Sequence, residues 1–288
     1  MQKLKLNVNW IFASSAVASY LLGVLIARSS GRSIHLLSLA AGLLIFFAFY
    51  LLQIIQRYLT SNRVNPFTTV RYSGQSRSST AQVLVLVSFL AIFAGLFLLL
   101  QAKVLIGTNL LLLIALGLVM FISMGRFSRL WFNSMSWLFE GLVVSPLMFL
   151  LGSAIQEYQF SNLVFLLCMP IFFLYCASAI TLLFAEYDQN SSTRNISFIN
   201  SVGWEKALKF HHVLTVMTYV SLLAYLATSN TWSRNWPALL LGLVSGAEVF
   251  FLEQIARGMR PNWPLIRALA IVQFFSLIYL LAYPLLIK

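Results

Sequence analysis

Long apolar runs, separated by short stretches of charged and turn-forming residues, follow one another along the whole sequence. A helix that crosses a bilayer needs about 20 predominantly apolar residues, and this pattern predicts an all-α protein with nine membrane-spanning helices. We treat residues 1–288 as a single transmembrane domain. The predicted spans are approximately 10–27, 34–56, 82–101, 104–122, 131–152, 161–185, 211–228, 237–255 and 264–286.

Two of the connecting segments, about 57–81 and about 186–210, are long, and long loops are often functional. With nine spans, 14 of the 19 Lys and Arg residues fall on the side of the N-terminus. Because cytoplasmic segments carry the excess of basic residues, the sequence predicts a cytoplasmic N-terminus and a C-terminus on the opposite side. Both long loops are then cytoplasmic, which predicts a functional site assembled from them.

The composition agrees with this architecture, because 60% of the residues are hydrophobic and only 9% are charged. A soluble domain carries roughly a quarter charged residues, so a soluble enzyme is excluded. The net charge of +12 predicts contact with anionic membrane lipid rather than nucleic acid, because no soluble basic domain presents these charges. Cys168 and Cys176 lie in one apolar run, so we expect packing residues, without a disulfide framework or a zinc site.

Each long loop contains a motif. Residues 62–71 read Asn-Arg-Val-Asn-Pro-Phe-Thr-Thr-Val-Arg, followed by Ser-Gly-Gln-Ser at 73–76. Residues 186–190 read Glu-Tyr-Asp-Gln-Asn, followed about a dozen residues later by Val-Gly-Trp-Glu-Lys-Ala at 202–207. These segments resemble the two motif regions of UbiA-type membrane prenyltransferases, namely Asp-Arg-x-Asn-Pro-x-Thr in the first, and Asp-x-x-x-Asp followed by Leu-Gly-x-x-x-Ala in the second.

The resemblance implies a UbiA-like bundle around a central cavity that opens to the cytoplasm. Members of this family transfer an isoprenoid chain from its diphosphate to an aromatic or lipid-like acceptor, and their aspartates bind two Mg²⁺ ions that hold the diphosphate. Mg²⁺ prefers carboxylate and phosphate oxygens, and it neutralises the departing diphosphate. An i, i+4 spacing places the carboxylates on one helical face.

The sequence departs from the family at these aspartates. In the first motif, aligned positions carry Gln53, Ile54, Tyr58 and Asn62, and none of them supplies a carboxylate. In the second motif, Glu186 and Asn190 replace the two aspartates, and Asp188 lies between them. A two-metal site is therefore not expected, and at most one Mg²⁺ would be held, by Glu186 and Asp188.

Three interpretations follow from this departure. Prenyl transfer is impaired or lost, and the fold binds an isoprenoid, quinone or tetrapyrrole lipid. Alternatively, the protein is an active prenyltransferase in which arginines replace part of the metal charge and bind the diphosphate directly. A third interpretation is an accessory subunit that packs against other membrane proteins. The arginines in question are Arg57, Arg63, Arg71 and Arg194.

Two further carboxylates are candidates because a charge within a membrane span is energetically costly. Glu140 lies in the fifth predicted span and Glu248 in the eighth, where we expect either a cavity-facing role or helix–helix hydrogen bonding. For Glu253 we expect an i, i+4 ion pair with Arg257. His211 and His212 fall at the predicted start of the seventh span, where a solvated position is expected. No Ser/His/Asp set or phosphate-binding glycine loop is present.

Overall fold

Every regular element in the described part of the chain is a helix. The computed structural model describes residues 9–31, 33–61, 75–104, 107–124, 135–157, 162–189, 198–229 and 231–287. The helices of the first half are α1 (Trp10–Ser29), α2 (Leu36–Ser61), α3 (Gln75–Gln101), α4 (Gly107–Met124), α5 (Ser136–Leu142), the π-helix η3 (Val143–Leu147) and α6 (Met148–Glu157). Those of the second half are α7 (Asn162–Gln189), α8 (Phe198–Val202), α9 (Trp204–Ser229), α10 (Trp232–Asn235), the 3-10 helix η4 (Trp236–Leu240), α11 (Leu241–Ala256) and α12 (Trp263–Leu286).

The apolar segments in the described part of the chain are consistent with the nine predicted spans. Within the described residues, eight helical stretches are long and apolar enough to cross a membrane, and Gly107–Ile122 is a shorter apolar helix. Two stretches combine consecutive elements: α5, η3 and α6 form one span, and α10, η4 and α11 form another. The predicted all-α membrane fold is confirmed.

The helices on either side of the two long loops extend further than predicted. Helix α2 continues to Ser61 and α3 begins at Gln75, while α7 continues to Gln189 and α9 begins at Trp204. Hydrophobicity marks the part of a helix that lies in lipid, but backbone hydrogen bonds continue into the polar interface. The segments outside these helices are therefore shorter than the predicted 57–81 and 186–210, and α8 lies within the second.

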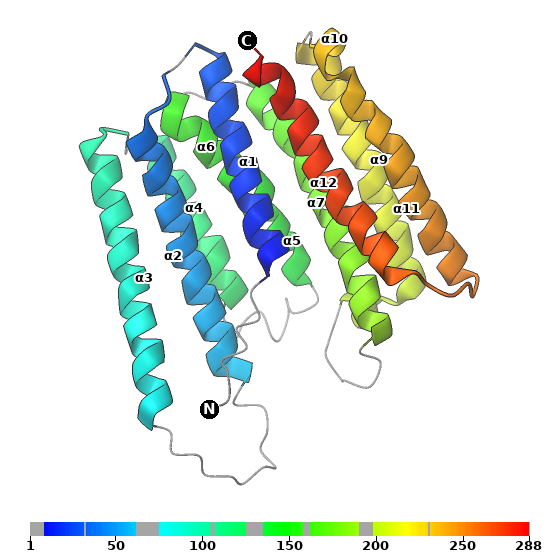
Figure 1. Cartoon of the computed structure of the whole chain (residues 1–288), viewed down its shortest axis with the longest axis horizontal. Helices are drawn as coiled ribbons and strands as arrows, with labels where there is room; N and C mark the ends of the chain where they lie inside the picture. Colours follow the sequence, from blue (N-terminus) through cyan, green and yellow to red (C-terminus); the bar gives the residue numbers. More distant parts are fainter. Residues whose placement is uncertain are drawn as a thin grey trace.

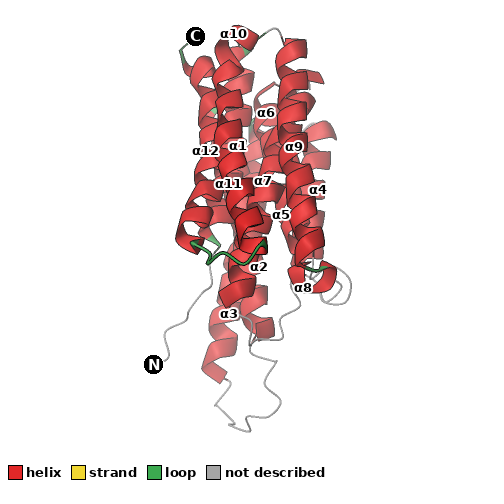
Figure 2. Cartoon of the chain, turned by 90° about the vertical axis from the view of Figure 1, so that its right-hand side faces the viewer, coloured by secondary structure: helices red, strands yellow, loops and turns green. Residues whose placement is uncertain are grey.

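Helices α2 and α7 end at the same end of the bundle, where α1 begins (Figure 1). We call this end the motif end, because the first motif follows α2 and the second begins in the last turn of α7. Helix α12 finishes at the opposite end, and all the long helices run along one common direction in both views (Figures 1 and 2). The first and last spans, α1 and α12, pack against each other.

Small residues let α1 and α6 approach closely. Ser15, Ser19, Gly23 and Ala27 recur at every fourth position of α1, so they share one face, and all four are buried. On α6, a Cβ atom added to Gly152 would overlap the carbonyl oxygen of Tyr20. In lipid, helix association depends on such close backbone contact between small residues, because apolar side chains gain little by leaving apolar solvent.

A proline accounts for the irregular turn in the fifth span. Pro146 lies inside the π-helix between α5 and α6, and proline has no N–H to donate to the preceding turn. A local widening to π-helix accommodates the missing bond. The neighbouring Ser145 hydroxyl donates to the Cys168 carbonyl oxygen of α7 at 2.7 Å. Cys168 and Cys176 are both buried and free, as expected for packing residues.

Gly152→Ala should lower the free energy of unfolding by about 1–3 kcal/mol, because overpacking forces the backbones of α1 and α6 apart. Gly246→Ala is the matched control, because a Cβ atom at Gly246 would meet no atom within 4 Å. The control should be neutral or stabilising by up to about 1 kcal/mol through helix propensity. Thermal unfolding of the purified protein in detergent measures both, and equal stability of the two variants would contradict the close contact.

Candidate functional site

The first motif region is poor in metal ligands. Gln53 and Ile54 lie in α2, and Gln53 is buried, with 2% of its surface exposed. A neutral amide and an aliphatic side chain therefore occupy two of the positions at which the resemblance places metal-binding residues. Arg57 and Tyr58 belong to the helical backbone of α2, but their side chains are outside the described residues. Also outside the described residues are Asn62, Arg63, Arg71, Asn190 and Arg194.

No aspartate or glutamate precedes Glu140 in the sequence. Helices α1 to α4, and all segments between them, therefore cannot contribute a carboxylate to any site. Mg²⁺ is usually bound through one or two carboxylates together with phosphate oxygens and water. The residues of the first motif do not fit a resident Mg²⁺ ion. Among the described residues, no group of three or more His, Cys, Asp or Glu side chains could hold a metal ion.

The second motif region lies at the end of α7. Glu186 is exposed in the last turn of this helix, and the backbone of Asp188 continues the helix, although its side chain is outside the described residues. Residues two apart on an α-helix point in directions about 200° apart. A single ion held jointly by Glu186 and Asp188 is therefore disfavoured while α7 remains helical to Gln189.

The glycine of the second motif opens α9, as the resemblance implies. Gly203 has a φ of +89°, a left-handed conformation that glycine adopts without strain. It separates α8 from α9, and its carbonyl oxygen accepts a hydrogen bond from the fully buried Ala207 at 3.0 Å. The adjacent Trp204 ring lies 4.4 Å from the ring of Phe184 and 6.5 Å from that of Trp263. Aromatic packing thus joins α7, α9 and α12 at the motif end.

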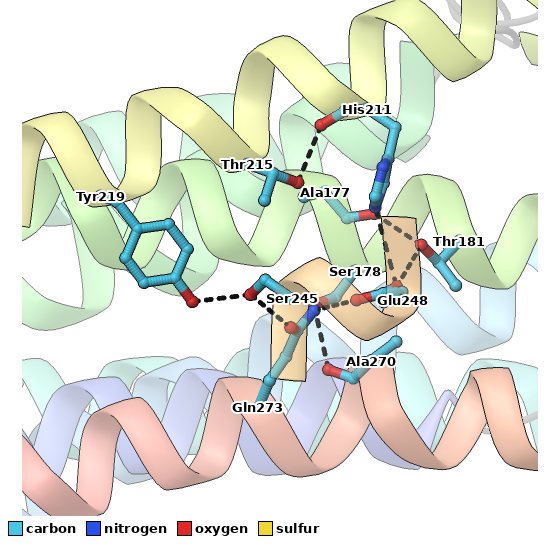
Figure 3. A network of polar contacts seen from close by, with 10 residues as sticks. All are labelled: Ala177, Ser178, Thr181, His211, Thr215, Tyr219, Ser245, Glu248, Ala270 and Gln273. Atoms are coloured by element: carbon cyan, nitrogen blue, oxygen red, sulfur yellow. Dashed lines mark hydrogen bonds and ion pairs between the residues drawn. The ribbon is translucent and has the colours of Figure 1, made fainter. Parts of the chain in front are cut away.

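A buried polar network surrounds Glu248 in the second half of the bundle (Figure 3). The Thr181 hydroxyl of α7 donates to Glu248 Oε1 at 2.6 Å, and the Gln273 amide of α12 donates to Glu248 Oε2. His211 Nε2 of α9 lies 3.7 Å from Glu248 Oε1. Glu248 and His211 are both buried. One carboxylate therefore connects α11 with three other helices.

The network continues from Gln273 towards α9. The Ser245 hydroxyl donates to Gln273 Oε1 at 2.8 Å, and Tyr219 OH lies 2.6 Å from Ser245 Oγ. Because Ser245 uses its proton on Gln273, Tyr219 is the donor to Ser245. Ser178 adds a separate contact between α7 and α12, since its hydroxyl donates to the Ala270 carbonyl oxygen at 3.0 Å. Hydrogen bonds from Tyr219 onward therefore all run towards the Glu248 carboxylate.

The expected solvated position of His211 is wrong. Helix α9 begins at Trp204 rather than near residue 211, so His211 lies about two turns inside the helix and is fully buried. The sequence did not predict the partners of Glu248, because they come from helices that are distant in the chain. The only signal in the sequence was Glu248 itself, a carboxylate within an apolar run.

Two other acidic residues have partners on neighbouring helices. Glu253 Oε1 lies 3.7 Å from His212 Nδ1, so the ion-pair partner found for Glu253 is on α9 rather than at Arg257. The Tyr175 hydroxyl of α7 donates to Glu140 Oε2 of α5 at 3.5 Å. This contact is of the helix–helix kind expected for Glu140.

The comparisons with known proteins identify the fold. No protein-family model and no curated protein match this sequence. A solved structure of digeranylgeranylglyceryl phosphate synthase superimposes with a TM-score of 0.66 at 15% identity, covering 100% of both chains. A UbiA homologue from Archaeoglobus fulgidus gives a TM-score of 0.56 at 16% identity, covering 94% of this chain and 98% of the other.

The same homologue bound to GPP and Mg²⁺ gives a TM-score of 0.55 at 17% identity, covering 93% of this chain and 98% of that one. These likenesses extend over nearly the whole bundle. The chain is thus an integral membrane protein with the UbiA fold, and the predicted resemblance is confirmed at the level of the fold.

Thr181→Val should lower the free energy of unfolding by about 1–3 kcal/mol, because it leaves the buried Glu248 carboxylate without one of its donors. Thr228→Val is the matched control, since Thr228 is exposed on α9 and its hydroxyl bonds only the carbonyl oxygens of its own helix. We expect the control to change stability by less than about 0.5 kcal/mol. A Thr181 variant as stable as the control, by chemical or thermal unfolding, would argue against a stabilising role of this bond.

Proposed function

We propose that this protein binds an isoprenoid, quinone or pigment-type lipid within a UbiA-like bundle, and that metal-dependent prenyl transfer is impaired or lost. The observation that carries this proposal is the lack of any carboxylate before Glu140, which removes the first metal site from α2 and the segment after it. Without that charge, a departing diphosphate is not neutralised. The lipid would occupy a central cavity that opens at the motif end.

The apolar character of the bundle supports a lipid ligand. Aromatic side chains from α7, α9 and α12 gather at the motif end around Trp204. A UbiA homologue with the same fold is described as bound to GPP, which has an isoprenoid chain. Binding of the isoprenoid part requires apolar surface rather than metal ligands, so it survives the loss of the aspartates.

The alternative is an active prenyltransferase that uses one metal ion. The Mg²⁺ in the GPP-bound homologue favours this alternative. Glu186 remains at the first position of the second motif, and it is exposed at the end of α7. In this case Arg57, Arg63, Arg71 and Arg194 would supply the remaining positive charge to the diphosphate.

Incubation with geranyl diphosphate, Mg²⁺ and a lipid extract of the source membrane, which supplies acceptors, should release no diphosphate above the rate without protein, because the residues of the first motif would not hold a metal ion. The measurement is a coupled diphosphate assay on the full chain in lipid nanodiscs. Release that depends on Mg²⁺, is lost in Glu186→Gln and Asp188→Asn, and persists in the control Glu205→Gln would establish the alternative. Glu205 is a suitable control because it is exposed in the first turn of α9.

Mass spectrometry of the protein purified in mild detergent should detect an isoprenoid, quinone or tetrapyrrole lipid enriched over its level in the source membrane. Enrichment is expected because an apolar cavity within the bundle retains a matching ligand while bulk lipid exchanges with detergent. The total lipid extract of the same membrane is the reference. Bulk phospholipid alone, in the proportions of that extract, would count against a dedicated lipid site.

The proposal includes the predicted orientation and leaves room for an assembly. With the motif end cytoplasmic, the basic residues Lys206, Lys209, Arg257 and Arg260 would face the anionic leaflet. Cysteines introduced beside them should then react with impermeant reagents only from the cytoplasmic side.

If the protein is instead an accessory subunit, it should be recovered only within a stoichiometric membrane complex.

A further inference from the structure

Two acid–imidazole pairs lie one after the other between α9 and α11. The inner pair is His211 and Glu248, with 3.7 Å between Nε2 and Oε1. The outer pair is His212 and Glu253, with 3.7 Å between Nδ1 and Oε1. The rings of His211 and His212 are 5.8 Å apart and nearly perpendicular. We call the four residues Glu253, His212, His211 and Glu248 the α9–α11 series.

The α9–α11 series runs from the partly exposed Glu253 to the buried Glu248. The side chain of Glu253 is 40% exposed and that of His212 is 26% exposed, whereas those of His211 and Glu248 are each 1% exposed. His211 and Glu248 lie seven and eight residues from the motif ends of their helices. This is about 10–12 Å along a helix that rises 1.5 Å per residue. A proton that reaches Glu248 from the motif end must therefore enter the apolar part of the bundle.

Each imidazole directs one nitrogen at its carboxylate, at a distance of 3.7 Å. His212 Nε2 and both ring nitrogens of His211 are buried and have no hydrogen-bond partner among the described residues. Neutral imidazole carries one donor and one acceptor nitrogen, so it accepts a proton at one side and releases it from the other. His212 Nε2 and His211 Nδ1, the two nitrogens that face neither carboxylate, belong to adjacent residues of α9.

The inner pair accommodates the proton in either of two places. With Glu248 ionised, the carboxylate accepts hydrogen bonds from Thr181 and Gln273 and faces His211 as its imidazolium. With Glu248 protonated, its O–H donates to Thr181 Oγ1, and the Thr181 hydroxyl turns to the Ala177 carbonyl oxygen, which lies 3.3 Å away. Neither arrangement leaves Thr181 or Glu248 without a hydrogen bond.

The other groups around the inner pair are neutral or distant. Helix α7 contributes the Thr181 and Ser178 hydroxyls and α12 contributes the Gln273 amide. Helix α9 contributes Tyr219, which reaches Glu248 only through Ser245 and Gln273. Among the described residues, the ion-pair partner of Glu248 is His211. The donors that point at Glu248 therefore favour the ionised carboxylate with the proton on His211.

We propose that His211 and Glu248 form a buried proton-binding site that exchanges its proton with the motif end through His212 and Glu253. At each step one N–H or O–H bond breaks as another forms. The inner pair thus gains one proton and the solvent loses one. The carboxylate–imidazole gaps are about 0.8 Å longer than a usual N–H···O bond, so each transfer between a carboxylate and an imidazole accompanies a small approach of α9 and α11. This site is independent of the proposed lipid function.

Infrared spectroscopy of the full chain in lipid nanodiscs tests the site, because a protonated carboxylic acid has a carbonyl-stretch band that a carboxylate lacks. At neutral pH this band should be absent from the unaltered protein. It should appear in His211→Gln, where Glu248 loses its cationic partner and takes up a proton, and vanish in His211→Gln/Glu248→Gln. A band of equal strength in the unaltered protein, or none in His211→Gln, would overturn the proposal.

The route through His212 and Glu253 is tested by following the protonation of the inner pair over time, by infrared spectroscopy, after a rapid drop in pH. Protonation of the inner pair should be slowed several-fold in His212→Gln and in Glu253→Gln, and it should keep its rate in the control Glu205→Gln. These variants alter partly exposed or exposed side chains, so the route stays testable even if changes at Glu248 prevent folding. Equal rates in all three variants would refute an entry path through the outer pair.

Discussion

A carboxylate inside an apolar bundle needs hydrogen-bond donors, and those of Glu248 belong to the neighbouring helices. Thr181 of α7 and Gln273 of α12 donate directly, and His211 Nε2 of α9 lies 3.7 Å from the carboxylate. Among the eight long apolar stretches of the described residues, those of α3, α9 and α10–α11 have the smallest share of buried residues. A polar contact that cannot exchange with water fixes how α9 and α11 sit against α7 and α12.

The two halves of the chain solve the packing problem differently. In the first half, which has no acidic residue before Glu140, small side chains bring α1 against α6, and Gly152 rests on the backbone at Tyr20. In the second half, buried polar side chains connect the spans. Small-residue contacts and interhelical hydrogen bonds are the two means by which helices associate in lipid. Hydrogen bonds between helices also occur in the first half, where Tyr20 donates to the Leu39 carbonyl oxygen and Asn109 to that of Ala154, but the buried carboxylate network lies in the second half.

This protein shares the backbone fold of the UbiA structures, but its first motif has different chemical groups. The bundle superimposes on UbiA structures over nearly its full length, yet the aligned positions of α2 carry an amide and an aliphatic side chain. Backbone arrangement depends on apolar pattern and small residues, which tolerate wide changes in sequence. Metal binding depends on a few carboxylates, and the first motif of this sequence has none.

The sequence alone determined the nine spans, their approximate limits and the class of fold, because a bilayer demands long apolar helices whatever their neighbours. It also determined the absence of carboxylates from the first motif. It did not determine where α9 begins, because a helix continues into the polar interface. The predicted start of the seventh span was therefore too late, and His211 was wrongly expected to be solvated. Only the tertiary structure decided the partners of Glu248, since Thr181, His211 and Gln273 belong to spans distant in the chain. Hydropathy records how apolar a helix is, whereas the pairing of polar groups depends on which faces of the helices meet.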